Sequence, residues 1–208
     1  LILGEICRAA QKGATALAFF YSRVMARGDL VKALVKGKAQ KRAVRTLLAA
    51  KEEICDTVDA VKERDPAARS KFEVFFLYSG YKAVRAYRRA NWFYRHNMKF
   101  IARWISQRAR HKTGVEIHPG ATIGKGLFID HGMGVVIGET TVIGDNCTLY
   151  QNVTLGGTGK EHGKRHPTLG NNVLVGSGAK VLGPFRVGDN ARIAAGAVVL
   201  TEVPDNAT

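Results

Sequence analysis

Aliphatic residues recur every six positions through the C-terminal part of the chain, and this repeat constrains the fold more than any other feature. The thirteen repeat positions, all Ile, Leu or Val, are 117, 123, 129, 137, 143, 149, 155, 169, 175, 181, 187, 193 and 199. These three residue types fill 24 of the 88 residues from 117 to 204, so chance does not explain the agreement. Six residues suit one short strand and a tight turn, and three such units close a triangular coil of about 18 residues. We therefore expect coils stacked about 4.8 Å apart by parallel pairing, with the aliphatic residues pointing inward.

The composition changes sharply before this repeat begins. Residues 1–112 hold 25 Lys and Arg against 9 Asp and Glu, whereas residues 113–208 hold 7 against 8. Glycine divides the other way, with 5 in the first part and 18 in the second. The first part is rich in strong helix formers, so we predict a basic α-helical domain over 1–112 and a repeat domain over 113–208. Asp65 and Pro66 are the predicted cap and first residue of one helix.

Arginines alternate with apolar residues at helical spacing from Phe72 onward. The plainest interpretation is an amphipathic helical bundle with a solvated basic face. A nucleic-acid patch, a membrane-surface helix and a field that steers an anionic ligand are the alternatives. No recognition motif supports the first two, so we expect neither a nucleic-acid nor a membrane partner.

Cysteine use and hydropathy indicate the compartment. The three cysteines, Cys7, Cys55 and Cys147, are widely spaced and form no CxxC pair, which favours free thiols, a reducing cytoplasmic location and no zinc site. No apolar run approaches the roughly 20 residues that span a bilayer.

Two interruptions of the sixfold repeat mark the candidate binding site. Two extra residues, assigned to Val135 and Val136, follow Asp130 and His131. Eight more fall in an excursion loop at 156–168, which contains Arg165 and His166. A loop that leaves a rigid coil is a common place for a binding site, and both interruptions carry histidine.

The motifs around these interruptions resemble those of a known enzyme family. The motifs are Arg64-Asp-Pro-Ala, Glu116-Ile-His-Pro-Gly, Ile129-Asp-His-Gly-Met-Gly, Ile137-Gly-Glu-Thr, Asn152-Val-Thr-Leu-Gly-Gly-Thr-Gly-Lys and Lys164-Arg-His-Pro. Together they resemble the serine O-acetyltransferases, a family of hexapeptide-repeat acyltransferases, over roughly residues 60–208. The resemblance implies an α+β fold, in which an N-terminal α-helical domain precedes a left-handed parallel β-helix. It also implies acetyl transfer from acetyl-CoA to the L-serine hydroxyl in cysteine biosynthesis, with acetyl-CoA as co-substrate and no tightly bound cofactor or metal.

The resemblance assigns roles to particular residues. An alcohol needs a base as it attacks a thioester, and His131 is the candidate, with Glu116 holding its imidazole where the family has Asp. The residues implied to bind serine are Asp65, Asp130, Arg165 and His166. Those implied to bind the coenzyme are Gly157, Ser177, Arg192 (often Lys in the family) and Ala195. Cys147 stands at an inward repeat position, so we do not expect a covalent route through its thiol.

The resemblance also implies partners. The family packs three prisms into a trimer with sites between subunits, and its helical parts join trimers into a hexamer. L-Cysteine is the implied feedback inhibitor, because it competes for the serine pocket. The family's C-terminal tail docks into O-acetylserine sulfhydrylase, and we expect that partner only through a tail that this chain does not contain.

The sequence also fits other functions. A hexapeptide acetyltransferase for a sugar or another small hydroxyl acceptor also needs a histidine and CoA, but not Asp65, Asp130 and Arg165 together. An acceptor such as homoserine is a second alternative. A zinc enzyme of the γ carbonic anhydrase type needs three converging histidines, and His131, His162 and His166 are available. The non-enzymatic alternative is a solenoid scaffold with a helical arm that binds nucleic acid.

Overall fold

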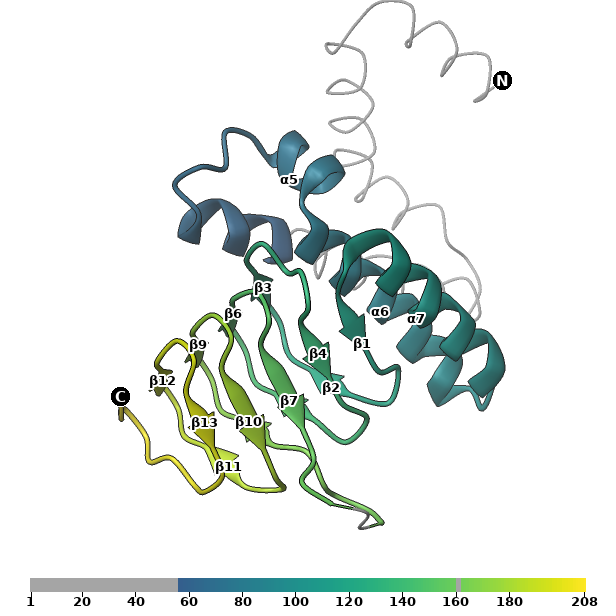
Figure 1. Ribbon diagram of the computed structural model, residues 1–208. Coiled ribbons are helices and arrows are strands. Elements are labelled where there is room, and N and C mark those ends of the chain that lie inside the picture. The colour runs from purple at the N-terminus through teal and green to yellow at the C-terminus, as the bar shows by residue number, and fades with distance from the viewer. Residues whose placement is uncertain (1–55, 160–161) are drawn as a thin grey trace, which may run out of the picture. The chain divides into compact units, whose positions relative to one another are not determined.

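The repeat residues line the interior of a three-sided parallel β-helix (Figure 1). This is seen in a computed structural model of the chain that describes residues 56–159 and 162–208. Each side is one parallel sheet that takes every third strand, so one coil contributes one strand to each side. Sheet A contains β1 (Glu116–Ile117), β4 (Val136–Ile137), β7 (Thr154–Gly156), β10 (Lys180–Leu182) and β13 (Val198–Val199). Sheet B contains β2 (Thr122–Ile123), β5 (Val142–Ile143), β8 (Thr168–Leu169) and β11 (Arg186–Val187). Sheet C contains β3 (Phe128–Ile129), β6 (Thr148–Leu149), β9 (Leu174–Val175) and β12 (Arg192–Ile193).

The strand register confirms the predicted inward rows of aliphatic residues. In sheet A, Ile117, Ile137, Leu155, Val181 and Val199 stand in one row, each paired with the next. Every repeat position except the last is buried, and Val199 packs partly buried against the same core. Each fully buried aliphatic side chain contributes roughly 1.5–3 kcal/mol, so the rows supply the main stabilisation of the coils.

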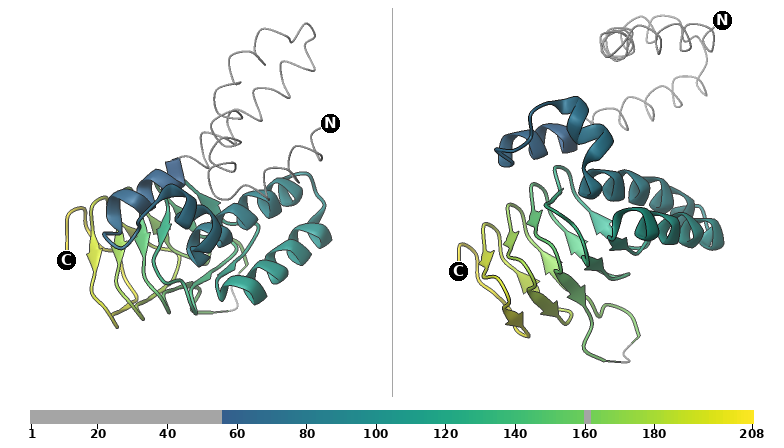
Figure 2. Two further views of the ribbon diagram at one scale, coloured as in Figure 1. Left: turned by 90° about the horizontal axis from the view of Figure 1, so that it is seen from above. Right: turned by 45° about the horizontal axis from the view of Figure 1, so that its top comes forward.

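Within residues 56–113, four helical segments precede the β-helix, and they belong to the same compact unit, residues 53–208. Residues 56–64 are helical, followed by α5 (Lys71–Leu77), α6 (Ser79–Arg95) and α7 (Lys99–Thr113). Helices α6 and α7 pack on each other and on β1, at the end of the prism opposite the C-terminus (Figure 2). The rest of the predicted helical domain, with Cys7 and Cys55, lies outside the described residues.

The predicted helix start at Asp65 and Pro66 is wrong. These residues form a turn after the helical segment 56–64, and the Asp65 carboxylate accepts a hydrogen bond from Ala67 N at 2.8 Å. The next helix, α5, begins at Lys71 and is capped by Ser70, whose side chain accepts from Glu73 N. An Asp–Pro pair satisfies a turn as well as a helix start, because the Asp side chain bonds the backbone two residues on in either case.

The two extra residues near His131 are also not where the sequence placed them. Val136 pairs in register with Glu116 in sheet A, and Val135 is a buried core residue like its equivalents in other coils. The additional length lies instead in the turn 130–134, immediately around His131. The spacing of the aliphatic residues shows that two residues are inserted, but it does not show whether they lie in the turn or in the strand that follows.

Candidate active site

Most predicted site residues lie at the two ends of the strands of sheet A, where the chain turns from one sheet into the next. The edge between sheets C and A, here the C–A corner, is formed by the turns 130–134, 150–152, 176–178 and 194–196. The edge between sheets A and B, here the A–B corner, is formed by residues 118–121, 138–141, 156–157 and 164–167. In Figure 1 the turn that follows β3 lies at the upper end of the strands of sheet A, and the excursion loop lies at the lower end. The two groups of residues are therefore separated by the width of the sheet.

His131 stands in a tight turn at the C–A corner. Its φ is 56°, in the left-handed region, and Gly132 N donates to Asp130 O at 2.6 Å across it. Such a three-residue turn is rare and strained for a residue other than glycine. The turn leaves the His131 side chain exposed, and within the described residues it forms no hydrogen bond or ion pair. The imidazole is therefore free to meet a ligand or a neighbouring subunit.

Asp65 is bonded by a tyrosine that lies two residues before Gly80, the residue that packs on this corner. Tyr78, the residue between α5 and α6, donates through its hydroxyl to Asp65 Oδ2 at 2.6 Å. Burial, this hydrogen bond and the charges of Asp65 and Asp130 raise the pKa of Tyr78 to about 12. The phenol thus stays protonated and donates to Asp65, one of the carboxylates that the sequence assigns to the serine ammonium group.

Two close contacts attach this part of the helical region to the β-helix. The Arg64 guanidinium donates to Gly126 O at 2.5 Å, Asn146 O at 2.9 Å and Thr148 Oγ1 at 2.9 Å. Gly80, in the first turn of α6, lies directly on the Ile129 carbonyl, where any larger residue would clash. Because Arg64 precedes Asp65 and Ile129 precedes Asp130, these contacts set the positions of both carboxylates.

Thr140 organises the A–B corner. Its hydroxyl accepts from Arg165 N at 3.1 Å and from His166 N at 3.2 Å, which fixes the returning end of the excursion loop. Thr140 N donates to His166 Nδ1 at 3.1 Å, so Nδ1 is an acceptor and the proton is on Nε2. Burial, followed by the charges of Arg165 and Lys164, lowers the pKa of His166. His166 is therefore a neutral Nε2–H donor, suited to hold a carboxylate or a developing oxyanion.

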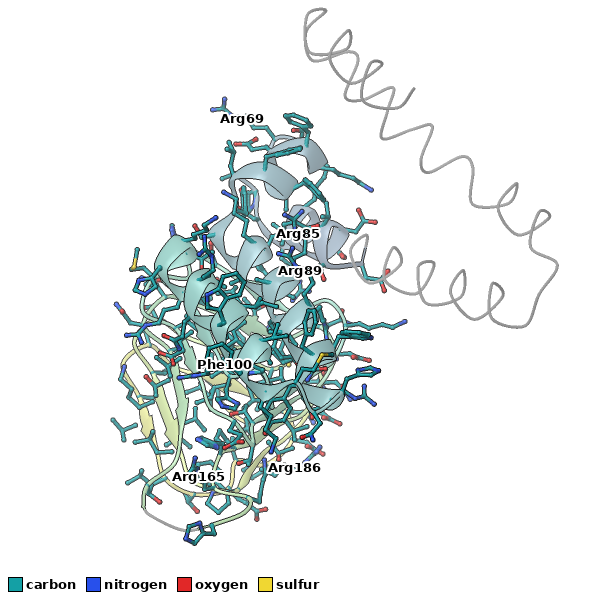
Figure 3. All side chains as sticks on the ribbon, turned by 90° about the vertical axis from the view of Figure 1, so that its right-hand side faces the viewer. Arg69, Arg85, Arg89, Phe100, Arg165 and Arg186 are labelled. Atoms are coloured by element: carbon teal, nitrogen blue, oxygen red, sulfur yellow. The ribbon has the colours of Figure 1, made fainter. Side chains whose placement is uncertain are left out.

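Arg165 lies beside His166, at the excursion-loop end of the β-helix (Figure 3). Its guanidinium is 3.6 Å from Glu139 Oε2, an ion pair too long for a hydrogen bond. Glu139 Oε1 instead accepts from the Tyr94 hydroxyl at 2.8 Å, and this bond lowers the pKa of Glu139. Among the described residues, the Arg165 guanidinium has N–H groups that can pair with the two oxygens of a carboxylate.

His118 completes the A–B corner. Its Nδ1 accepts from Gly120 N at 3.0 Å, and burial lowers the pKa of His118. Its ring meets that of Tyr94 edge-on, with 5.9 Å between centroids. His118 is thus a neutral, fixed side chain close to Arg165 and His166.

Glu116 lies on the outer face of β1, between the two corners. Its carboxylate is paired with two arginines of α7, Arg103 at 3.3 Å and Arg110 at 3.1 Å. The described structure shows no hydrogen bond between Glu116 and His131. A carboxylate has about four acceptor positions, and the two arginines engage one position on each oxygen. The contacts of Glu116 therefore leave acceptor positions for His131, and the pairing of these two residues stays a prediction.

The predicted coenzyme residues also divide between the corners. Ser177 and Ala195 lie on successive coils of the C–A corner, where Gly196 N donates to Ser177 O at 2.8 Å. Gly157 lies at the A–B corner, next to the backbone of Arg165. Arg192 is exposed on β12 of sheet C, shortly before Ala195.

Within one chain, the two corners lie too far apart to contact the same small molecule. The turns 130–134 and 138–141 are separated by residues 135–137, which is four residue steps or roughly 13 Å at 3.3 Å per residue. Hydrogen bonds and charge effects join Asp65, Tyr78 and Asp130 at one corner, and Glu139, Arg165 and His166 at the other. An amino acid that touches both groups must lie between two chains.

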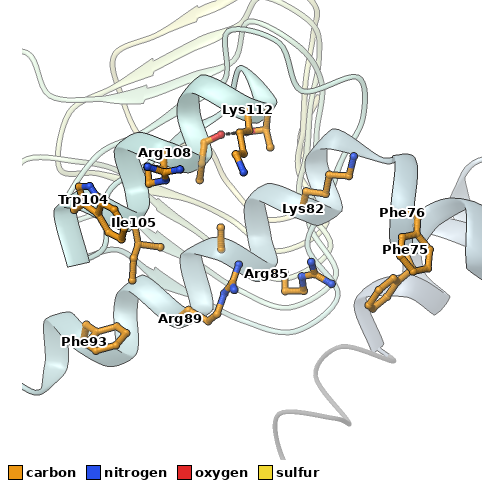
Figure 4. Close-up of a pocket in the computed structure, with 13 residues that line it drawn as sticks. Phe75, Phe76, Lys82, Arg85, Arg89, Phe93, Trp104, Ile105, Arg108 and Lys112 are labelled. Atoms are coloured by element: carbon orange, nitrogen blue, oxygen red, sulfur yellow. Dashed lines mark hydrogen bonds between the residues drawn. The ribbon is translucent and has the colours of Figure 1, made fainter. Parts of the chain in front are cut away.

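Other features of the described residues do not carry this chemistry. A groove of about 780 Å³ lined by α5, α6 and α7 contains aromatic and basic side chains, including Trp104 and Arg108, but none of the predicted site residues (Figure 4). Cys147 is buried, and burial raises the pKa of its thiol to about 11, so its thiolate is not available. Residues 56–159 and 162–208 contain no cluster of three metal-ligating side chains. Nor does any helix in those ranges have the length and apolar character to cross a membrane.

The coils and the two histidine-bearing corners define a hexapeptide-repeat transferase. Residues 166–201 match the family described as bacterial transferase hexapeptide (six repeats), and residues 2–86 match that described as serine acetyltransferase, N-terminal. The chain belongs to the serine acetyltransferase family, and its β-helix is left-handed.

Relatives and solved structures agree with this assignment. The serine acetyltransferase of Helicobacter pylori (strain J99) is 61% identical over 152 residues, 73% of this chain and 89% of the relative. The serine acetyltransferase of Bacillus subtilis (strain 168) is 58% identical over 153 residues, which cover 74% of this chain and 70% of the relative. The Brucella abortus enzyme in complex with coenzyme A has a TM-score of 0.76 at 34% identity, covering 97% of this chain and 87% of that one. The structure of a serine acetyltransferase in complex with cysteine also has a TM-score of 0.76, at 37% identity, and the match covers 80% of this chain and 69% of that one.

The sequence interpretation missed several residues of the site. Glu139 and Thr140 lie within one of the motifs but had no predicted role. Their position, after a repeat residue and before the excursion loop, could have indicated that they belong to the candidate site. Tyr78 and Tyr94 had no such signal. Each lies at one end of α6, and only the packing of that helix shows which carboxylate its hydroxyl reaches.

Proposed function

We propose that this protein transfers acetyl from acetyl-CoA to the hydroxyl of L-serine, giving O-acetylserine and CoA in cysteine biosynthesis. The observation that carries the proposal is the sorting of the site into an acidic corner with Asp65 and Asp130 and a corner with Arg165 and neutral His166. A zwitterionic acceptor requires both, since its ammonium group binds carboxylates and its carboxylate binds a guanidinium. A sugar hydroxyl requires neither.

His131 is the proposed general base. It takes the proton of the serine hydroxyl as the oxygen attacks the thioester carbon, and it later gives that proton to the departing CoA thiolate. Glu116 is proposed to hold the imidazole and to stabilise its charged form. The exposed, strained turn at His131 suits this role, because it presents the ring at an edge where another chain can lie against it.

The acetyl-CoA arm is proposed to run along the C–A corner. From the coil of His131 to that of Ala195 there are three coil steps, about 14 Å at 4.8 Å per step. An extended arm of amides suits such an edge, with the thioester at His131 and the phosphates towards Arg192. Ser177 and Ala195 lie along this edge, and Gly157 would reach the arm from the A–B corner of a neighbouring chain.

The division of the site supports a trimer with active sites between subunits. In a cyclic trimer the C–A corner of one subunit faces a different edge of the next, so one such contact joins Asp130 and His131 to Arg165 and His166. A dimer of trimers is a further prediction, and O-acetylserine sulfhydrylase is predicted as a partner only through the family's C-terminal tail. A cytoplasmic location is also proposed, which the free, buried thiol of Cys147 favours.

L-Cysteine is proposed as a competitive feedback inhibitor. It has the same ammonium and carboxylate groups as serine, so the same two corners recognise it. Its thiol would replace the serine hydroxyl near His131.

The direct test is an acceptor comparison. The protein is mixed with acetyl-CoA and either L-serine, L-homoserine or a simple sugar, and release of the CoA thiol is followed. We expect rapid release with L-serine. Faster release with the sugar or with homoserine would contradict the proposed acceptor.

A further inference from the structure

Helix α6 carries a tyrosine hydroxyl to each of the two corners. Tyr78 immediately precedes the helix, and Tyr94 lies in its last turn. The sixteen residue steps from Tyr78 to Tyr94 span about 24 Å at 1.5 Å per residue, more than the width of sheet A. One rigid helix thus reaches both parts of the site.

At the first end, the Tyr78 hydroxyl fixes the direction of Asp65. The hydroxyl donates to Oδ2 at 2.6 Å, and Ala67 N donates to Oδ1 at 2.8 Å. Two donors on opposite oxygens leave the carboxylate little rotational freedom. Gly80, two residues after Tyr78, lies directly on the carbonyl of Ile129, the residue before Asp130, so the ordered carboxylate lies on the side of the β-helix that carries Asp130.

At the other end, the Tyr94 hydroxyl keeps Glu139 from binding Arg165 closely. It donates to Glu139 Oε1 at 2.8 Å, while Oε2 stays 3.6 Å from the Arg165 guanidinium. Without the phenol oxygen, Glu139 is free to turn and form a close pair with Arg165. That pair would compete with the carboxylate of the acceptor for the same N–H groups.

We propose that Tyr78 and Tyr94 are positioning residues for the acceptor, Tyr78 for its ammonium group and Tyr94 for its carboxylate. The proposal rests on the proposed function, since it assigns each tyrosine to one half of the serine site. Neither hydroxyl contacts the reacting atoms. Each acts by preorganising one charged side chain before the acceptor arrives, which lowers the ordering cost of binding.

The test compares three Tyr→Phe variants of α6 and its flanking residue. Tyr78→Phe and Tyr94→Phe remove the two proposed hydroxyls. Tyr87→Phe is the matched control, because its buried hydroxyl donates at 2.6 Å to a backbone carbonyl, Ala121 O, rather than to a side-chain carboxylate. Each variant is assayed with L-serine, with 3-hydroxypropionate, which lacks the amine, and with serinamide, which lacks the carboxylate.

We expect opposite acceptor patterns from the two variants. Tyr78→Phe should raise KM for L-serine and serinamide by roughly 10-fold, the effect of one hydrogen bond to a charged group, and leave 3-hydroxypropionate unchanged. Tyr94→Phe should raise KM for L-serine and 3-hydroxypropionate to a similar degree and leave serinamide unchanged. KM for acetyl-CoA should stay at the Tyr87→Phe value in both. Where an analogue reacts too slowly, its inhibition constant against L-serine gives the same comparison.

Two results would overturn the proposal while leaving the proposed function intact. One is an L-serine KM in both variants equal to that of Tyr87→Phe. The other is an equal rise for all three acceptors, which indicates general loosening rather than positioning. If a variant melts early, double-mutant cycles of Tyr78→Phe with Asp65→Asn and of Tyr94→Phe with Glu139→Gln still measure the coupling, and additive effects count against the proposal. If the unmodified protein releases no CoA with L-serine, the proposed function itself is wrong and this inference falls with it.

Discussion

Replacing Gly138 with alanine should damage the serine site through a single side chain, His166. Gly138 follows β4, and a Cβ built there would overlap the Cδ2 and Nε2 atoms of the His166 ring. The φ of Gly138 is not in the left-handed region, so alanine meets no backbone strain. The coil retains its hydrogen bond from Gly138 N to Leu155 O at 3.0 Å. The ring must therefore move while the coil stays in place.

The cost follows from the contacts that the ring loses. His166 Nδ1 is bonded to Thr140 N at 3.1 Å and to Thr140 Oγ1 at 2.8 Å. At roughly 1 kcal/mol for each net hydrogen bond, Gly138→Ala should lower the free energy of unfolding by about 2 kcal/mol. The displaced Nε2–H donor should raise KM for L-serine by roughly 10-fold, with a smaller change in KM for acetyl-CoA.

Urea unfolding and steady-state kinetics measure both effects, and Gly156→Ala is the matched control. Gly156 lies at the same corner one coil further on, and its Cβ would meet the flexible end of the Leu182 side chain at 2.9 Å. That variant should stay close to the unmodified enzyme in both assays. If Gly138→Ala keeps its stability and its serine KM, the His166 ring is not held over Gly138 and the assignment of its tautomer is wrong.

Three further predictions concern the catalytic and binding residues. His131→Ala should reduce kcat by roughly 100-fold or more with near-normal coenzyme binding, and an active alanine variant would remove His131 from the mechanism. Arg165→Ala should raise KM for L-serine more than KM for acetyl-CoA, and the reverse order would mean that the pocket is misassigned. The lowered pKa values of His118 and His166 mean that the unfolded chain binds protons that the folded chain does not. Unfolding free energy should therefore fall as pH drops below about 6.5 towards the lower folded-state values, and a flat profile there would contradict the buried neutral state.

The repeat domain was predictable in detail because each of its strands obeys the same local rule. An aliphatic residue every six positions predicts a three-sided coil that buries all of them, and the register of Ile117, Ile137 and Leu155 follows from it. The spacing does not give the left hand of the coil, which only the family resemblance implied. The turn around His131 was harder to predict. The aliphatic count detects two extra residues, but only the pairing of Val136 with Glu116 shows that they precede the strand.

For the proposed site, the sequence indicates residue types and not positions. Asp65, Asp130, Arg165 and His166 have the charges that an amino acid requires, yet the sequence does not show that they lie at opposite edges of one sheet. Contacts that depend on the packing of α6, such as Tyr78 with Asp65 and Tyr94 with Glu139, leave no periodic pattern. The Asp65–Pro66 turn shows the same limit, because a carboxylate that bonds a nearby backbone N–H suits either a helix cap or a turn.

The central claim is that each active site takes its two corners from different subunits, and subunit complementation tests it most directly. His131→Ala and Arg165→Ala are each expected to be nearly inactive at low serine concentration. When the two variants are co-expressed in equal amounts, random assembly of a cyclic oligomer should restore about one quarter of the sites, because some interfaces then pair an intact C–A corner with an intact A–B corner. The same variants mixed after separate assembly are the control and should stay inactive. Activity that remains at the level of the single variants after co-expression would place both corners of each site within one chain and contradict the account.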